Sequence, residues 1–291
     1  MSNLQSFYTK FLDLLEKIEP SDNFLNQIRI PKLSDKELLS LALASEACGI
    51  DSENHLFKQL PQHLKGRIER SVYNRRRRRL TPKLEMLRNK VSEQIIPSEQ
   101  YHLIDSMPLE TCKISRAKRS TVCNIDEQTA PDYGFCAAQN MHYFGYKLHA
   151  VCTVQGVIKM FDISKASCHD IHYLNDVKRQ LNHCVLIGDK GYLSRAVQAD
   201  LFEASAIELA TPKRSNQPGS KLYPKEFRRA RKRIETLFSQ LCDQFMIRRN
   251  YAKQFQGFGA RISAKITAFT FIQWLNVQSG NKINNIKIAF S

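Results

Sequence analysis

The sequence lacks the features of membrane and secreted proteins. Its best apolar stretch, residues 266–277, is short and interrupted by Thr and Gln, which excludes a transmembrane helix there. The first twenty residues carry acids among their apolar positions and no small-residue cleavage site, so we expect no signal peptide. These absences predict a cytoplasmic protein that does not engage a membrane.

Cysteine pairs at metal-binding or redox spacing are absent as well. The eight cysteines are scattered along the chain without a CxxC pair, which is typical of a reducing compartment where thiols serve as small apolar side chains. Cys168, His169 and His172 suggest a zinc site, but no second pair of ligands stands at a suitable spacing. We therefore expect no zinc site.

Positive charge is present in excess, and it is concentrated. The net charge of the chain is +16, whereas residues 61–90 alone carry +9 and residues 213–233 carry +8. Two basic patches that account for the whole imbalance predict a polyanionic partner, with nucleic acid the first choice. A single basic run is more often a solvated helix face, and neither patch has a broad apolar face that could lie on lipid.

The hydrophobic pattern divides the chain near Pro97. Before it, helical spacing, the capping box at Ser34 and the Thr81-Pro82 pair predict a basic, all-helical region over residues 1–96. The turn at Gly49 fits a helix-turn-helix or an ordinary helical hairpin. After Pro97 we expect strands, separated by a helix, followed by a long amphipathic helix and C-terminal helices. The strands are predicted at 101–110, 142–154, 156–164 and 184–188. This pattern predicts an α/β domain with a mixed sheet over residues 97–291.

Three carboxylates occupy positions suited to a shared site. Asp105 ends an apolar stretch, Asp189 follows the apolar run VLIG, and Glu235 borders the buried face of the long helix. Asp189 stands between two glycines, in IGDKGY, which fits either a turn that the carboxylate caps or an open strand end that presents it. Phosphodiester chemistry uses such carboxylates to hold two divalent cations, which activate one oxygen and stabilise another.

The motifs LIDSMPLE, FGYKLHAV, ASCHD, IGDKGY and RKRIETLFSQL, in this order, resemble the catalytic core of DDE-type insertion-sequence transposases. The similarity covers roughly residues 100–250 and is greatest to the insertion sequence 982 family. It implies a ribonuclease-H-like fold, with Asp105, Asp189 and Glu235 as catalytic metal ligands. It also implies two Mg²⁺ ions as cofactors, for which Mn²⁺ substitutes. Since these are prokaryotic elements, it implies a nucleoid-associated protein.

Related families carry tyrosine seven residues before the glutamate, arginine four before and lysine seven after. Here those positions hold Arg228, Arg231 and Cys242, so only Arg231 matches. Helical spacing still places Arg228, Arg231 and Lys232 on the turns before Glu235, where they could contact a phosphate backbone. We also expect phosphate contacts from the arginine run, which comprises Arg75, Arg76, Arg77, Arg78 and Arg79.

The predicted function is DNA transposition by binding of terminal inverted repeats, metal-dependent cleavage at the element ends and joining of the 3′-hydroxyls to target DNA. The predicted partners are both double-stranded DNAs and further copies of the chain on DNA. A nuclease of the same fold without strand transfer, or a DNA-binding regulator with an inactive site, remains the alternative. His149 could face the site, although a packed role is more usual, and His169 with Asp170 is expected to begin a helix.

Overall fold

The computed structural model describes residues 3–26, 28–213 and 223–287, and the chain forms two compact units. The helical unit comprises Met1–Ile95 and Gln240–Ser291, and the α/β unit comprises Ile96–Ser239. We predicted that residues 240–291 belong with the strands, but the structure groups them with the N-terminal helices. Part of the second basic patch and of the loop predicted before the long helix, residues 214–222, lies outside the described residues.

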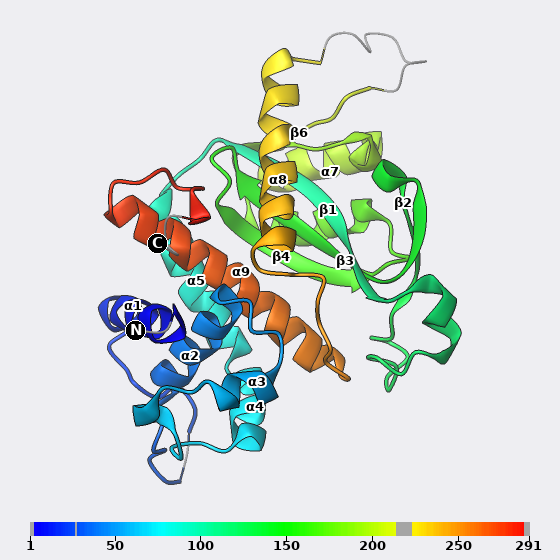
Figure 1. Cartoon of the computed structure of the whole chain (residues 1–291). Coiled ribbons are helices and arrows are strands. Elements are labelled where there is room, and N and C mark those ends of the chain that lie inside the picture. Colours follow the sequence, from blue (N-terminus) through cyan, green and yellow to red (C-terminus); the bar gives the residue numbers. More distant parts are fainter. Residues whose placement is uncertain (1–2, 27, 214–222, 288–291) are drawn as a thin grey trace. The chain divides into compact units, whose positions relative to one another are not determined.

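The helical unit is built around its last helix. α9 is buried over most of its length, including polar positions, and it packs against α5 and α2 (Figure 1). A helix that is covered on nearly all sides is central to its unit. This burial explains why the C-terminal segment belongs with the N-terminal helices. The helices of this unit are α1 (Asn3–Ile18), α2 (Asp35–Ala47), α3 (Glu53–Lys58), α4 (Arg70–Arg79), α5 (Thr81–Ile95) and α9 (Phe255–Gln278), with a 3₁₀ turn η1 (Gln62–Leu64).

The predicted capping box at the start of α2 is confirmed. The Glu37 amide donates to Ser34 Oγ at 3.1 Å, and the Ser34 amide donates to Glu37 Oε2 at 2.8 Å. Arg67 also donates to both oxygens of the Glu37 carboxylate. Two backbone donors that the helix leaves unpaired are thereby satisfied, which fixes the start of α2.

One buried carboxylate, that of Glu46, forms ion pairs with three cationic side chains inside the helical unit. Glu46 of α2 is fully buried, and its oxygens lie 2.7 Å from Lys265 Nζ, 3.1 Å from Arg261 Nε and 3.8 Å from Arg77 Nη1. Burial raises the pKa of Glu46, but the three cations outweigh it and leave the pKa below its usual value. The carboxylate therefore stays charged and links α2 to α4 and α9.

The sheet of the α/β unit confirms the predicted ribonuclease-H-like fold. In the described residues it has six strands in the order β2-β3-β1-β5-β6, with β4 also pairing with β3. β3 runs antiparallel to β1 and β4, whereas β5 and β6 run parallel to β1. The strands are β1 (Tyr101–Cys112), β2 (Asp132–Cys136), β3 (Met141–Thr153), β4 (Ile158–Lys165), β5 (Cys184–Ile187) and β6 (Ile207–Ala210).

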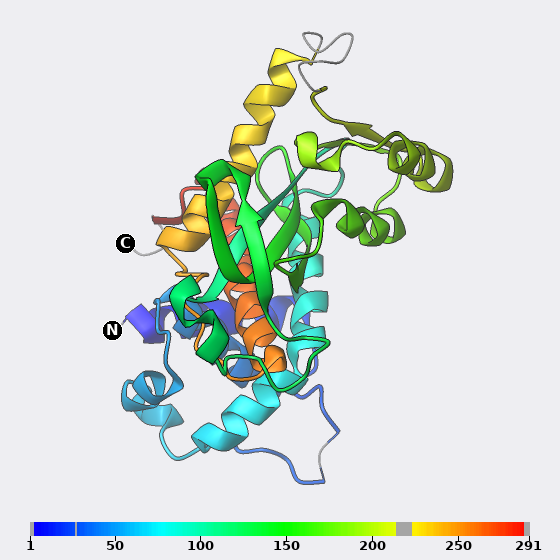
Figure 2. The same cartoon turned by 90° about the vertical axis from the view of Figure 1, so that its right-hand side faces the viewer.

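Helices cover both faces of this sheet (Figure 2). α6 (Leu174–Gln180) and α7 (Arg195–Ser205) lie on one side, over a core that includes Ile104, Val151 and Leu186. α8 (Lys225–Asp243) lies on the other side over its part up to Ser239. Alternation along β1 therefore turns Asp105 toward the α8 side, because its neighbour Ile104 faces α6 and α7. Short 3₁₀ turns complete the unit at η2 (Ile114–Arg119), η3 (Ala137–Gln139), η4 (Asp170–Tyr173) and η5 (Lys190–Tyr192).

Among the helices in the described ranges, none combines the length and hydrophobicity that a membrane span requires.

The Glu46 network makes a prediction about stability. Glu46→Gln leaves Lys265 and Arg261 buried without a full counter-charge, so it should lower the free energy of unfolding of the helical unit by about 3–5 kcal/mol. Urea denaturation followed by circular dichroism measures this loss. Glu93→Gln, at an exposed position of α5, is the matched control and should change stability by less than about 0.5 kcal/mol. Equal stability of the two variants would contradict the role of Glu46.

Candidate active site

The register between β1 and β5 brings two predicted carboxylates to one edge of the sheet. The parallel pairs are Tyr101 with Val185, His102 with Leu186 and Leu103 with Ile187. Continuing this register by two residues places Asp189, just beyond the end of β5, alongside Asp105 in the middle of β1. Asp105 and Asp189 therefore lie side by side, because β5 ends at Ile187 while β1 extends past the paired residue Leu103.

The two glycines around Asp189 have separate steric roles. A Cβ on Gly188 would lie 3.1 Å from Ile104 Cγ2 and 3.1 Å from the Tyr192 ring, so the strand end packs closely there. A Cβ on Gly191 would lie 2.9 Å from Asp189 Oδ1. Asp189 caps η5 by accepting from the Gly191 amide at 2.7 Å. The capping interpretation of IGDKGY is thus confirmed, and it leaves the second carboxylate oxygen of Asp189 without a hydrogen bond to a described residue.

Asp105 is held in an environment that disfavours its charge. Burial raises the pKa of Asp105 to about 7, and the charges of Asp189 and Asp170 act in the same direction. The Ser106 amide, which donates to Asp105 Oδ1 at 2.8 Å, and the charge of Arg231 oppose this shift. A half-buried carboxylate beside a second one, with a cation nearby, is the electrostatic pattern that a divalent cation would relieve.

α8 carries the third predicted carboxylate and the predicted cationic stripe. Glu235 is exposed, directly after buried Ile234, and it makes no ion pair with the described residues. Arg231 lies one turn earlier on the same helix face, close enough to Asp105 to lower the pKa of that carboxyl. Arg228 and Lys232 are exposed, and Arg228 Nη2 donates to the Tyr223 carbonyl at 3.3 Å. Arg231 of α8 therefore lies near Asp105, on the face of the sheet that α8 covers.

The described residues do not contain three His, Cys, Asp or Glu side chains grouped closely enough to hold a metal ion. The structure thus brings Asp105 and Asp189 into electrostatic contact, whereas Glu235 is not gathered with them into a set of three. Cys168, His169 and His172 likewise form no such group within the described ranges.

Two further residues of this region were missed by sequence reasoning. Asp170 accepts from Lys147 Nζ at 3.0 Å, and its charge raises the pKa of Asp105. Tyr192 is fully buried, and its hydroxyl has no hydrogen-bond partner among the residues that the structure describes. Its pKa is raised by burial and by the charges of Asp170, Asp105 and Asp189. The signal was present, because both lie in the motifs ASCHD and IGDKGY, but each is also an ordinary helix-start or core residue.

Two histidines near the site, His149 and His169, have structural roles. His149 is buried, stacks on the Tyr173 ring at 5.0 Å between centroids and bonds Ser164 Oγ at 2.7 Å. Burial lowers the pKa of His149 to about 4, so it is neutral at physiological pH. His169 caps η4 by accepting from the Ile171 amide at 3.2 Å, which confirms that a helical turn begins there.

The arginine run of α4 is divided between the core and the surface. Arg76 is buried against Asp35, with 2.5 Å between Nη2 and Oδ1, and Arg77 is buried against Glu53 at 2.9 Å. Their predicted contact with phosphate is therefore not supported, because both guanidinium groups are occupied by carboxylates. Arg75 and Arg79 are exposed, and Arg78 is half-buried. Only the exposed members stay candidates for DNA contact.

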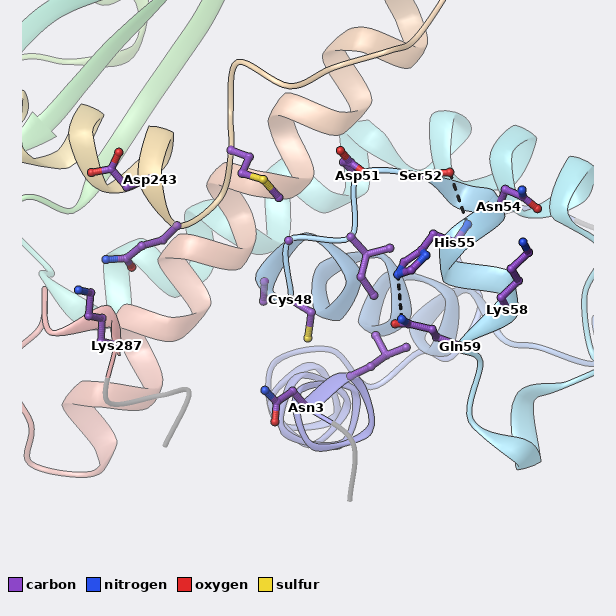
Figure 3. A pocket seen from close by; sticks show the side chains of 16 residues that line it. Asn3, Cys48, Asp51, Ser52, Asn54, His55, Lys58, Gln59, Asp243 and Lys287 are labelled. Atoms are coloured by element: carbon purple, nitrogen blue, oxygen red, sulfur yellow. Dashed lines mark hydrogen bonds between the residues drawn. The ribbon is translucent and has the colours of Figure 1, made fainter.

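A recess of about 1260 Å³ lies in the helical unit (Figure 3). Its lining alternates acids such as Asp51 and Asp243 with the basic side chains of Lys58 and Lys287. On one wall of the recess, His55 and Gln59 of the α3 region share a hydrogen bond of 2.8 Å. The recess gathers no carboxylate cluster and is not the candidate active site.

Comparison with known proteins identifies a family. Residues 97–271 match the family model described as transposase DDE domain. Among solved structures, the Mos1 transposase paired-end complex with left transposon end matches over 82% of this chain and 86% of that chain, at 12% identity and a TM-score of 0.22. That TM-score is too low to carry an argument. No match was found among curated proteins.

The electrostatics of Asp105 predict how stability depends on pH. A carboxyl whose pKa is raised in the folded state stabilises the fold while it is protonated, and this contribution is lost as the pH rises through that pKa. In chelator, the melting temperature of wild type should therefore fall relative to that of Asp105→Asn as the pH rises from about 4 to about 8. Glu203→Gln, at an exposed position of α7, should show no such trend. A difference between wild type and Asp105→Asn that is independent of pH would contradict the assignment.

Proposed function

The chain belongs to the transposase DDE domain family, a family of phosphoryl-transfer enzymes that act in transposition, and we propose the following function for it. It binds the terminal inverted repeats of an insertion sequence, hydrolyses the DNA at the element ends and joins the freed 3′-hydroxyls to target DNA. The motifs quoted above further favour the insertion sequence 982 branch. The observation that carries the proposal is the β1–β5 register, which sets Asp105 beside Asp189 within the matched region.

The residues at the sheet edge fit the divalent metals that this family generally uses. Mg²⁺ needs only a few carboxylates, because it keeps water molecules and takes phosphate oxygens as ligands. Asp105 and Asp189 would hold the ion, and Glu235 would join them from α8. The Tyr192 hydroxyl, which has no hydrogen-bond partner among the described residues, is close enough for the charges of Asp105 and Asp189 to raise its pKa. When bound, two Mg²⁺ ions, or Mn²⁺ in their place, activate the attacking oxygen and stabilise the leaving oxygen.

The protein itself supplies position and charge. The close packing at Gly188 fixes the Asp189 backbone, and the Gly191 amide holds one of its carboxylate oxygens. Arg231, beside Asp105, is placed to contact a phosphate oxygen of the scissile strand. Hydrolysis and joining are both in-line displacements at phosphorus, so one set of residues serves both steps. Neither step needs a covalent bond between DNA and protein.

The proposed partners are the element ends and the target DNA, bound by several copies of the chain. Arg75 and Arg79 of α4 are proposed to contact phosphates, as are Arg228 and Lys232 of α8. Such contacts fix the position of a protein on the duplex without reading its sequence.

Alanine variants at the three carboxylates test the proposed chemistry. Asp105→Ala, Asp189→Ala and Glu235→Ala should each abolish Mg²⁺-dependent cleavage and joining, because loss of one member of a catalytic unit is nearly as damaging as loss of all. Binding to terminal DNA in chelator should stay within a few-fold of wild type. Substantial cleavage by any one variant would remove that residue from the site. Cleavage by wild type without joining would indicate a nuclease, and binding without cleavage a regulator.

The division of the arginine run makes a separate prediction. Arg75→Ser with Arg79→Ser should weaken binding to every DNA sequence alike. The log–log dependence of affinity on salt should become shallower by about 0.9 for each lost phosphate contact. Arg76→Ser should instead lower stability, since it leaves Asp35 buried without its cation. Gel-shift titrations at several salt concentrations and thermal melts separate the two effects. A loss confined to terminal-repeat DNA, with an unchanged salt slope, would show that the exposed arginines read bases.

A further inference from the structure

We propose that the segment 248–254, which precedes α9, extends the exposed face of α4 into one surface that binds the sugar–phosphate backbone of duplex DNA. The inference rests on the proposed function only for the identity of the polyanion. Within the helical unit it assigns a binding role to Arg249, Tyr251 and Lys253, residues outside both basic patches of the sequence.

The C-terminal part of the chain is also basic, although it lies outside the two basic patches of the sequence. Residues 244–291 contain seven Lys and Arg and no Asp or Glu. Two of the seven, Arg261 and Lys265, are buried against Glu46 and are thereby accounted for. Arg249 and Lys253 are exposed, and neither forms an ion pair within the described ranges. Their charges are available to an external anion.

A buried asparagine holds this segment in a fixed conformation. Asn250 Nδ2 donates to the Phe258 carbonyl in the first turn of α9 at 2.9 Å, and Asn250 Oδ1 accepts from the Ala252 amide at 3.2 Å. The Arg249 amide donates to the Met246 carbonyl at 2.8 Å. Because the side chain at 250 points inward, the neighbouring side chains at 249 and 251 are directed to the surface. A preorganised segment loses less entropy when it binds than a floppy one.

The segment is joined to α4. Arg78 Nη1 donates to Gln254 Oε1 at 2.8 Å, and a Cβ on Gly257 would lie 3.8 Å from Arg78 Cδ. Arg75 and Arg79 flank Arg78 on the exposed side of α4, and neither makes an ion pair with a described residue. α4 and the segment before α9 lie side by side (Figure 1), and both carry exposed cations that make no ion pair within the described ranges.

Tyr251 identifies the kind of anion that fits. Its side chain is 67% exposed, although large aromatic side chains usually find cover in a folded protein. It stands between two cationic positions, and its hydroxyl is a donor that can reach a phosphate oxygen. An array of fixed cations with a neutral donor between them suits the regular phosphates of a duplex. Since it has no broad apolar face, it does not suit a lipid surface.

Binding of a mixed-sequence duplex in chelator tests the surface, because phosphate contacts do not depend on sequence. Arg249→Gln with Lys253→Gln should weaken binding at least tenfold near physiological salt and make the log–log salt dependence shallower by about 1.8, or 0.9 per contact. Tyr251→Phe should weaken binding by a few-fold without a change in slope, because the lost hydroxyl is neutral.

The matched control is Lys10→Gln with Lys17→Gln. It removes the same charge from exposed positions of α1, which lies away from the start of α9 (Figure 1). Lys17 instead lies over the Trp274 ring near the other end of α9. This control variant should change affinity less than threefold. Equal losses in the two double variants, or unchanged binding in the first, would overturn the surface. Should the first variant fail to fold, acetylation of wild type replaces it: DNA should protect Lys253 and leave Lys10 reactive, and the reverse pattern would overturn the proposal.

The outcomes distinguish this surface from the proposed function. If wild type binds and cleaves DNA with Mg²⁺ while both double variants bind equally well, only the surface is overturned. If wild type binds DNA through Arg249 and Lys253 but never cleaves it, the surface stands and the proposed chemistry is overturned. If wild type binds no DNA, both are overturned.

Discussion

The pairing of β1 with β5 is the constraint on which the candidate site depends. A parallel pair of strands that keeps Leu103 opposite Ile187 leaves Asp189 at a strand end beside Asp105, within a sheet that helices cover on both faces. A slip of one residue would turn Asp105 to the other face and separate the two carboxylates. The close contact of Gly188 with Ile104 and Tyr192 makes such a slip sterically costly. The same packing that holds the register also brings like charges together.

The α/β unit brings negative charges together, whereas the helical unit contains an excess of positive charge. Buried carboxylates, of which Glu46 is central, neutralise the cations that face the core and join helices far apart in sequence. Several other cations, among them Arg75, Arg79, Arg249 and Lys253, are exposed and form no ion pair with the described residues. A single arginine run thus supplies both internal ion pairs and external charge, and its residues divide according to the side of α4 on which they lie.

Local patterns in the sequence were sufficient for part of the fold. The capping box at Ser34, the strand that carries Asp105 and the turn after β5 depend on nearest neighbours, and the structure confirms each. β2, α7 and β6 were not predicted, since they are short and weakly patterned. The association of α9 with the N-terminal helices was also not predicted, because it depends on packing between distant segments. The position of α9 near the end of the chain does not indicate that it packs against α2 and α5.

The candidate site shows the same limit. Asp105 and Asp189 could be selected from strand ends and family motifs, whereas the buried state of Arg76 and Arg77 depends on acids more than twenty residues away. Asp170 and Tyr192 lie in the motifs ASCHD and IGDKGY, but they were missed because a helix-start acid and a core tyrosine at those positions have ordinary structural explanations. Their electrostatic interactions with Asp105 follow only from the folded sheet and from the turns η4 and η5 that bring them near it.

The sharing of a divalent cation by Asp105 and Asp189 is central to the proposed function. An anomalous difference map from crystals grown with Mn²⁺ tests it most directly. Mn²⁺ takes the same oxygen ligands as Mg²⁺ and is visible by its anomalous scattering. We expect a peak between the two carboxylates, with Glu235 or solvent completing its coordination. A map with Mn²⁺ bound elsewhere on the protein and no peak beside Asp105 would contradict the account.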